Sequence, residues 1–302
     1  MPIPLDLART LAVVVAEGTL DAAARRLHVT PSAISQRIRA LEDRLGRVLL
    51  VRSRPVGVTE AGAAVVRLAR QLDVLEQDAL AAVGQSEGEW PALPLAVNAD
   101  SLATWFLPPL AAVAEEHNVR FELHRDDQDF TAGLLESGTV MGAVTSRAEP
   151  VAGCRVRGLG TLRYVPVASA AFARRWFADG AGDAELAVAP VVDFDRRDDL
   201  QSRWLAARGV SGTPPRHQVP ASHDFASAIA LGLGWGLLPP FQSEPGLSSG
   251  ALVRLAGPVV DVPLYWQQWN LTSSPLDTVA DALVAEAARV LEPLSARPVS
   301  RR

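Results

Sequence analysis

Residues Gly18–Leu50 read GTLDAAARRLHVTPSAISQRIRALEDRLGRVLL, and this stretch decides the expected fold of the first part of the chain. The alanine-rich run Leu20–Leu27 predicts one short helix, because alanine has the highest helix propensity. His28–Thr30 form the expected turn. Pro31 suits the first position of a second helix, where its missing N–H costs nothing. The stretch therefore predicts two helices joined by a tight turn.

The second of these helices has an apolar face and a polar face. Its apolar residues recur at spacings of four, three and four, which predicts a buried stripe. They are Ile34, Ile38, Leu41 and Leu45. The other face carries hydroxyl, amide and guanidinium groups, which bind phosphates and the edges of DNA bases. We predict a helix-turn-helix whose second helix enters the DNA major groove; a solvated helical hairpin is the alternative. The DNA-contacting residues expected here are Thr30, Pro31, Ser32, Ser35, Gln36, Arg37 and Arg39.

A short β-prone run with two arginines follows the helical pair. Residues Val48–Val58 read VLLVRSRPVGV, in which Pro55 and Gly57 predict a turn between two strands. A hairpin with Arg52 and Arg54 at its tip would clamp DNA phosphates and add affinity without reading the base sequence. An exposed loop is the alternative.

The charges of the chain are divided unevenly. The 302 residues carry a formal net charge of -5, and 48% of them are hydrophobic. Residues 1–58 contain nine arginines and five acidic residues, so they carry 9 − 5 = +4 and residues 59–302 carry −9. A basic segment on an acidic body predicts that only the first part contacts nucleic acid.

Residues 59–90 predict a long helix followed by a hinge. Thr59 can cap a helix that runs from Glu60 to about Val83, and its apolar residues alternate by three and four, as in a helix–helix seam. Twenty-odd residues with a rise of about 1.5 Å each form a rod on the order of 35 Å long. Gly84–Gly88 then breaks the helix. We expect this rod to join two copies of the chain.

Residues 91–302 alternate between short β-rich runs and helical segments, which predicts an α/β fold. The expected elements include one helix over Leu102–His117 and strands over Ala187–Val192 and Leu233–Leu238. The predicted division is therefore 1–58, a winged helix-turn-helix; 59–90, a linker helix and hinge; and 91–302, an α/β body.

Two polar clusters in this body suggest a ligand site. Asn98–Trp105 follows the first strand and opens a helix, where backbone N–H groups and the hydroxyls of Ser101 and Thr104 suit an anion. Plain capping by Ser101 is the alternative. The aspartates after the second strand would lie near that helix start in a parallel sheet. An anion site facing carboxylates matches an amino acid with a second positive charge, and Asp224 is a further acid that could be a cap or a ligand.

Other classes of protein find little support in the sequence. The chain has no Ser/His/Asp set, no metal-ligand spacing and a single cysteine, Cys154, so we expect no enzyme, metal or cofactor. Gly232–Gly236 resembles a nucleotide loop but lacks a following helix start. No apolar run reaches the roughly 18 residues of a membrane span, and no export signal is visible. We expect a cytoplasmic protein without a membrane partner.

The motifs together resemble those of the LysR-type transcriptional regulators. The resemblance rests on Ala22–Leu27, Ser32–Ile38, Arg52 and Thr59–Gly62, and it extends to the whole plan of the chain. It implies a two-lobed effector domain similar to a periplasmic solute-binding protein, with lobe I over about 91–165 and 266–302 and lobe II over about 166–265.

Two stretches resemble the arginine/lysine-responsive branch of this family. They are Thr30–Arg37 and Asn98–Trp105. This resemblance implies that Ser101 and Thr104 hold the α-carboxylate of lysine or arginine, with Asp127 and then Asp224 as candidates for its cationic end. The effector-binding residues expected on this basis are Ser101, Thr104, Trp105, Asp127, Gln128, Thr145, His223 and Asp224.

The expected function is a homodimeric or tetrameric regulator that senses a basic amino acid and controls an exporter gene. Its expected partners are double-stranded DNA, a second copy of the chain and RNA polymerase. A DNA-binding architectural or chromosome-initiation-inhibiting protein without ligand control is the alternative. An enzyme on a solute-binding fold is a weaker third reading, because no catalytic set is present.

Overall fold

A computed structural model describes residues 2–51, 53–83, 90, 92–125, 131–271 and 273–294. The chain forms two compact units. The first comprises Met1–Asn98, Pro109–Arg157 and Tyr265–Val284, and the second comprises Ala99–Pro108, Gly158–Leu264 and Ala285–Arg302. The domain boundaries expected from the sequence stay predictions.

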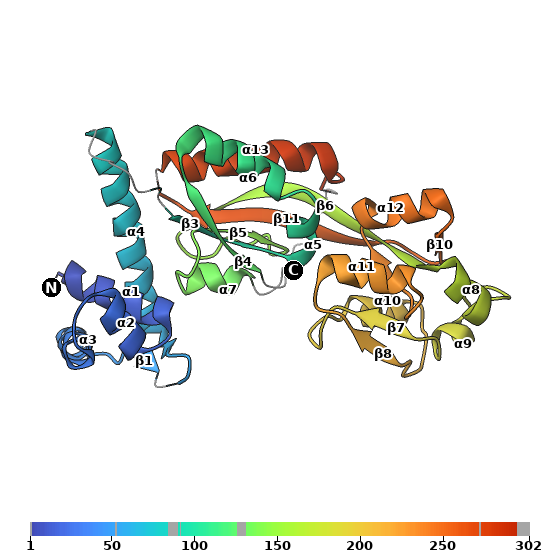
Figure 1. Ribbon diagram of the computed structural model, residues 1–302, viewed down its shortest axis with the longest axis horizontal. Helices are drawn as coiled ribbons and strands as arrows, with labels where there is room; N and C mark the ends of the chain where they lie inside the picture. Colours follow the sequence, from blue (N-terminus) through green and yellow to red (C-terminus); the bar gives the residue numbers. More distant parts are fainter. Residues whose placement is uncertain are drawn as a thin grey trace, which may run out of the picture. The chain divides into compact units, whose positions relative to one another are not determined.

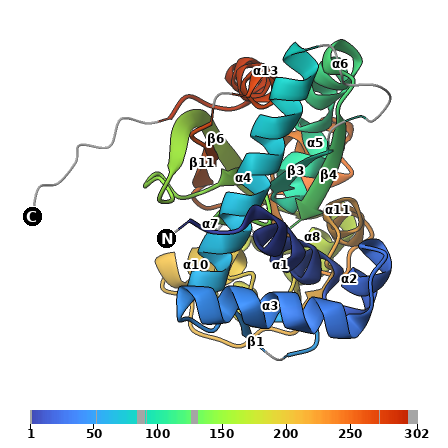
Figure 2. The same cartoon turned by 90° about the vertical axis from the view of Figure 1, so that its left-hand side faces the viewer.

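The N-terminal segment of the first unit consists of three helices packed together. They are α1 (Leu5–Glu17), α2 (Leu20–Arg26) and α3 (Pro31–Leu45). The hydroxyl of Thr19 accepts a hydrogen bond from Ala22 N (3.1 Å), and that of Thr30 accepts one from Ala33 N (3.2 Å), so each threonine caps the helix after it. Leu11, Ile34 and Leu41 are fully buried between the helices. Figure 2 shows α1, α2 and α3 at one end of the long helix α4.

The wing follows directly. Strands β1 (Leu50–Val51) and β2 (Gly57–Val58) pair antiparallel, with Leu50 opposite Val58. The Glu42 carboxylate accepts hydrogen bonds from Leu49 N (2.8 Å) and Leu50 N (3.4 Å), which fixes the wing to α3. Helix α4 (Glu60–Ala82) begins after Thr59, whose hydroxyl accepts a bond from Gly62 N (3.0 Å). Arg9 on α1 pairs with Asp73 on α4 (2.6 Å).

The rest of the first unit is built on a mixed sheet. Strand β3 pairs parallel with β4 and β5, and β5 pairs antiparallel with the end of β11. The bounds are β3 Ala92–Val97, β4 Arg120–Arg125, β5 Gly142–Thr145, β11 Val260–Trp269, α6 Leu107–His117, α7 Thr131–Glu136 and α13 Ser274–Val290. Trp266, Trp269 and Leu276 are fully buried in this core. The same elements are seen in Figure 1.

The second unit is built around β6, which pairs antiparallel with β9 and β10, while β7 and β8 form a separate parallel pair. Its strands are β6 Cys154–Ser169, β7 Val191–Asp193, β8 Arg216–Gln218, β9 Gly236–Leu238 and β10 Leu252–Arg254. Its helices are α5 Ala99–Thr104, α8 Ala170–Trp176, α9 Asp183–Leu186, α10 Leu200–Ala207, α11 Ser222–Ala230 and α12 Pro240–Ser249. Val167, Ile229 and Leu238 lie at the centre of its core.

The helix expected over Leu102–His117 is two helices. Helix α5 ends at Thr104, and α6 begins at Leu107. Pro108 and Pro109 explain the break, because a proline disfavours helical dihedrals in the residue before it but is tolerated in the first turn of a new helix. Trp105 and Phe106, which join the helices, are both buried.

Two expected strands are shorter than predicted, and one helix was missed. The strand expected over Leu233–Leu238 comprises only Gly236–Leu238, and the strand expected over Ala187–Val192 comprises Val191–Asp193. Helix α12 starts at Pro240, directly after β9, and it contains Pro245. The expectation that no helix start follows Gly232–Gly236 was wrong, because Pro240 occupies the first helical position, where proline is favourable.

We predict that Gly62→Ala destabilises the junction between the wing and α4. A Cβ on Gly62 would lie 2.1 Å from the backbone oxygen of Leu49, so the chain would have to shift. Overpacking of this kind costs about 1–3 kcal/mol. The midpoint of thermal unfolding, measured by calorimetry, should fall.

Gly133→Ala is the matched control, because Gly133 also lies in a helix, and a Cβ there meets nothing within 4 Å. Alanine is favoured over glycine inside a helix by roughly 0.5–1 kcal/mol, so this variant should unfold at the same or a higher temperature. An unchanged midpoint for Gly62→Ala would contradict the prediction.

Candidate functional site

Helix α3 presents one polar face to solvent. Ile34, Ile38 and Leu41 are buried on its inner side. Thr30, Pro31, Ser32, Gln36 and Arg39 are all exposed on the outside. Because a hydroxyl, an amide and a guanidinium lie exposed on one helix, this face can bond both base edges and phosphates.

Three other residues expected at the DNA interface differ in their surroundings. The Ser35 hydroxyl donates to Pro31 O (3.0 Å) within its own helix. The Arg37 guanidinium donates to the Thr10 hydroxyl on α1 (3.5 Å), so it is partly engaged inside the helical segment. Arg54 is exposed beside the β1–β2 hairpin, and Arg52 lies outside the described residues.

The predicted effector residues on α5 are buried rather than displayed. Ser101 is fully buried and Trp105 is 1% exposed. Among the described residues, neither the Ser101 hydroxyl nor the Trp105 indole N–H has a hydrogen-bond partner. Buried polar groups are nearly always bonded, so two such groups on one turn fit a polar ligand group. Thr104 is half-buried, and its hydroxyl donates to Asp100 O (2.6 Å).

Asp100, between Asn98 and Ser101 in the predicted motif, is half-buried. Its Oδ1 accepts a hydrogen bond from the Ser222 hydroxyl (2.6 Å), and its Oδ2 accepts one from the Tyr164 hydroxyl (2.7 Å). Burial raises the pKa of Asp100 above its usual value, although these two hydrogen bonds oppose the rise. Asp100 lies within the predicted motif Asn98–Trp105, but the sequence indicated no role for it.

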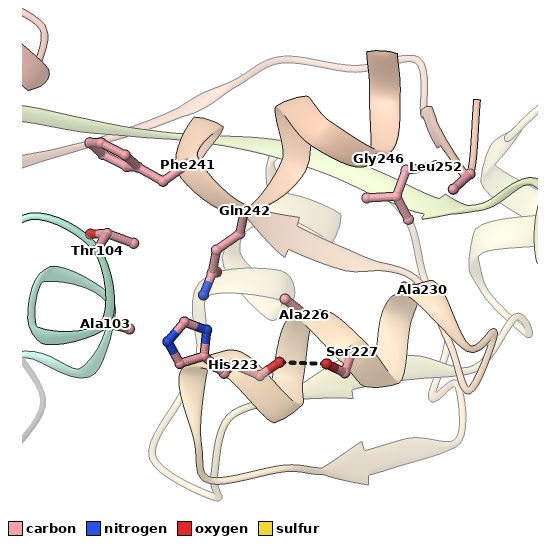
Figure 3. Close-up of a pocket in the computed structure, with 11 residues that line it drawn as sticks. Ala103, Thr104, His223, Ala226, Ser227, Ala230, Phe241, Gln242, Gly246 and Leu252 are labelled. Carbon is pink, nitrogen blue, oxygen red and sulfur yellow. Dashed lines mark hydrogen bonds between the residues drawn. The ribbon is translucent and has the colours of Figure 1, made fainter. Parts of the chain in front are cut away.

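A pocket of about 530 Å³ lies between α5, α11 and α12 (Figure 3). Its size falls within the range of small-molecule sites. The lining residues are Ala103, Thr104, His223, Ala226, Ser227, Ala230, Phe241, Gln242, Gly246, Ala251 and Leu252. Figure 3 shows Thr104, His223 and Gln242 around the same opening, with the Ser227 hydroxyl bonded to His223 O.

The pocket lining provides a mostly apolar surface with a few polar groups. No acidic side chain is among the lining residues, all of which belong to the described part of the second unit. Asp224 is exposed in the first turn of α11, next to His223. The lining therefore suits the apolar part of a ligand. Asp224, the predicted acid that follows the lining residue His223, is not itself a lining residue.

The other expected effector residues include Asp127, Gln128 and Thr145. Asp127 and Gln128 lie outside the described residues, as does the rest of the aspartate cluster. Thr145 is buried on β5 in the first unit, and its hydroxyl accepts a bond from Arg147 N (3.2 Å). The sequence did not single out Phe241 or Gln242, because both lie on the unpredicted helix α12.

Two broader observations concern other kinds of site. Over the described ranges, no set of three or more His, Cys, Asp and Glu side chains is placed to hold a metal ion. No described helix has the length and apolar character required to cross a membrane.

Comparison with known families gives two matches in chain order. Residues 5–63 match the family described as "Bacterial regulatory helix-turn-helix protein, lysR family". Residues 91–289 match the family described as "LysR substrate binding domain".

Individual relatives are similar over nearly their whole length. The lysine export transcriptional regulatory protein LysG of Corynebacterium efficiens is 44% identical, covering 95% of this chain and 98% of the relative. The crystal structure of ArgP from Mycobacterium tuberculosis has a TM-score of 0.84 at 43% identity, covering 95% of this chain and 98% of that one. Full-length LysG from Corynebacterium glutamicum with bound effector Arg has a TM-score of 0.78 at 38% identity, covering 96% and 100%.

These matches confirm the resemblance and the fold class expected from the sequence. Both predicted parts, the helix-turn-helix and the α/β effector domain, correspond to family segments in the expected order. The chain belongs to the LysR family of bacterial helix-turn-helix transcriptional regulators.

Proposed function

We propose that this regulator senses lysine or arginine and controls the transcription of an exporter gene for basic amino acids. The observation that carries the proposal is the full-length similarity to LysG, whose structure contains arginine as its effector. A relative that is 44% identical is named as a regulator of lysine export. In this proposal the amino acid is an effector ligand and not a cofactor, and the protein is a regulator and not an enzyme.

The proposed DNA interface is the exposed face of α3 together with the wing. Thr30, Ser32, Gln36 and Arg39 are the residues proposed to meet the major groove, with Arg54 on neighbouring phosphates. The net charge of +4 on residues 1–58 supports this assignment, because phosphate contacts dominate the affinity for DNA. RNA polymerase is a further proposed partner, since a transcription regulator acts at a promoter.

The proposed dimer forms through α4. Leu75, Leu80 and Val83 expose 41%, 40% and 69% of their surface on this helix or at its end. Apolar residues at such positions favour pairing with another helix. Two copies of α3 can then read two half-sites.

The proposed effector contacts place the α-carboxylate on α5. The Ser101 hydroxyl and the Trp105 indole N–H are both buried donors without a partner among the described residues. A carboxylate oxygen would satisfy each of them. Helix α5 has only six residues, so these side chains, rather than a helix dipole, would carry the recognition.

We predict that Ser101→Ala weakens the binding of lysine and arginine. Loss of one hydrogen bond to a charged carboxylate costs about 1.5 kcal/mol, which corresponds to roughly a tenfold higher Kd. Isothermal titration calorimetry measures this directly. Ser249→Ala is the matched control, because its exposed hydroxyl bonds only Gly246 O within α12 among the described groups. Absence of any binding heat for the unsubstituted protein with both amino acids would refute the sensing function.

We predict that Arg39→Ala lowers the affinity for operator DNA. Loss of a guanidinium contact to a base or phosphate costs about 1–3 kcal/mol, so the Kd should rise about ten- to a hundredfold at fixed salt. Fluorescence anisotropy with a DNA fragment that the unsubstituted protein protects in footprinting measures the effect.

Arg289→Ala removes the same charge from the exposed, C-terminal part of α13 and should leave the DNA affinity unchanged. If Arg39→Ala behaved like this control, α3 would not be the reading helix. Protection of many AT-rich sites in footprinting, without a defined operator, would instead support an architectural protein.

A further inference from the structure

Asp100 lies on a short excursion of the chain into the second unit. The chain leaves the first unit after Asn98 and returns to it at Pro109, so residues 99–108 belong to the second unit, whereas β3 before them belongs to the first. Something must hold α5, which has only six residues, in its place. A short isolated helix is not stable on its own. Side-chain contacts from α5 to its neighbours therefore decide its position.

The Asp100 carboxylate is the end point of a directed chain of hydrogen bonds. Gln242 Nε2 on α12 donates to the Ser222 hydroxyl (2.8 Å), and that hydroxyl donates to Asp100 Oδ1 (2.6 Å). The Tyr164 hydroxyl on β6 donates to Asp100 Oδ2 (2.7 Å). Donors that point one way polarise each other and strengthen the network. One carboxylate thus connects α5, β6, α11 and α12.

The two residues that donate to Asp100 are buried, so water cannot easily replace their hydrogen bonds. Tyr164 is 3% exposed and Ser222 is 6% exposed. Among the described residues the carboxylate is bonded by hydroxyls, with no arginine paired to it. Hydrogen bonds to a buried charged group are stronger than neutral ones, and the loss of one partner strands the other.

The same three helices form the walls of the pocket. Thr104 lies one turn after Asp100 on α5, and its hydroxyl bonds Asp100 O. His223 follows Ser222 directly on α11, and Gln242 itself lines the pocket from α12. The network residues therefore adjoin the lining residues on every helix that they connect.

We infer that Asp100 is the positioning residue of the effector pocket. Its carboxylate holds α5 against β6 and α11, so that Thr104 lines the pocket together with His223 and Gln242. Asp100 itself bonds the protein and not the ligand. The effector part of this inference rests on the proposed function; the attachment of α5 does not.

The first test compares Asp100→Ala with Asp100→Asn in calorimetric titrations with arginine and with lysine. An asparagine can still accept from Ser222 and can donate to the Tyr164 oxygen, so it preserves the attachment. Asp100→Ala should raise both Kd values about tenfold, as expected for the loss of a buried network partner, and Asp100→Asn should restore most of the affinity. If Asp100 instead paired with the effector's ammonium group, the asparagine variant would lose as much as the alanine variant. That result would overturn the inference.

The second test uses Tyr164→Phe and Ser222→Ala, which remove the donors and leave the carboxylate. Each should raise the Kd for arginine by a factor of about three to ten, and neither should add a further loss in the Asp100→Ala background. Tyr164→Phe should also lower the midpoint of thermal unfolding, because Asp100 Oδ2 loses the hydrogen bond from the Tyr164 hydroxyl. Additive losses in the double variants would contradict a shared positioning role.

The third test needs no ligand. The amides of Trp105 and Phe106 both donate to Ser101 O (3.1 and 3.0 Å), so their hydrogen exchange reports on the end of α5. Exchange at these amides should be faster in Asp100→Ala, and close to normal in Asp100→Asn. Unchanged exchange in Asp100→Ala would overturn the inference. Failure of the unsubstituted protein to bind either amino acid, with the exchange result intact, would refute only the proposed function.

Discussion

A carboxylate that is shielded from water needs hydrogen-bond donors from the protein. In the second unit, the donors to Asp100 connect α5, β6, α11 and α12. Asp100 receives its bonds from β6 and α11, and Gln242 of α12 supports one of the donors. Because each hydroxyl can donate only once, the bonds have one consistent direction. The positions of α5, α11 and α12 consequently depend on one another.

The N-terminal segment is organised by a different and more local rule. Thr19, Thr30 and Thr59 each accept a hydrogen bond from a backbone N–H three residues later, so a threonine hydroxyl begins each of α2, α3 and α4. Such caps need only a short stretch of chain. The helices of the N-terminal segment could therefore be predicted from the sequence, including the turn before Pro31 and the buried stripe of α3.

The α/β part was less readable, because its decisive contacts join residues far apart in the chain. The break at Trp105–Phe106 followed from Pro108 but was hidden by a continuous apolar pattern, and α12 was hidden by its prolines. The motif around Ser101 was found, whereas the role of Asp100 depends on Ser222, 122 residues away. Spacing along a sequence cannot reveal such a partner. Phe241 and Gln242 were missed for the same reason: they line the pocket only after α12 has folded against α11.

Leu49 connects α3 to the start of α4 through hydrogen bonds on both sides of its backbone. Its N–H is bonded to Glu42 on α3, its oxygen accepts from Thr59 N (3.0 Å), and the bare Cα of Gly62 lies against that same oxygen. The backbone of Leu49 is thus held by α3 through its N–H and by the residue before α4 through its oxygen. The end of α3 and the start of α4 therefore share one fixed backbone unit, and α4 cannot rotate about its own axis without straining these bonds.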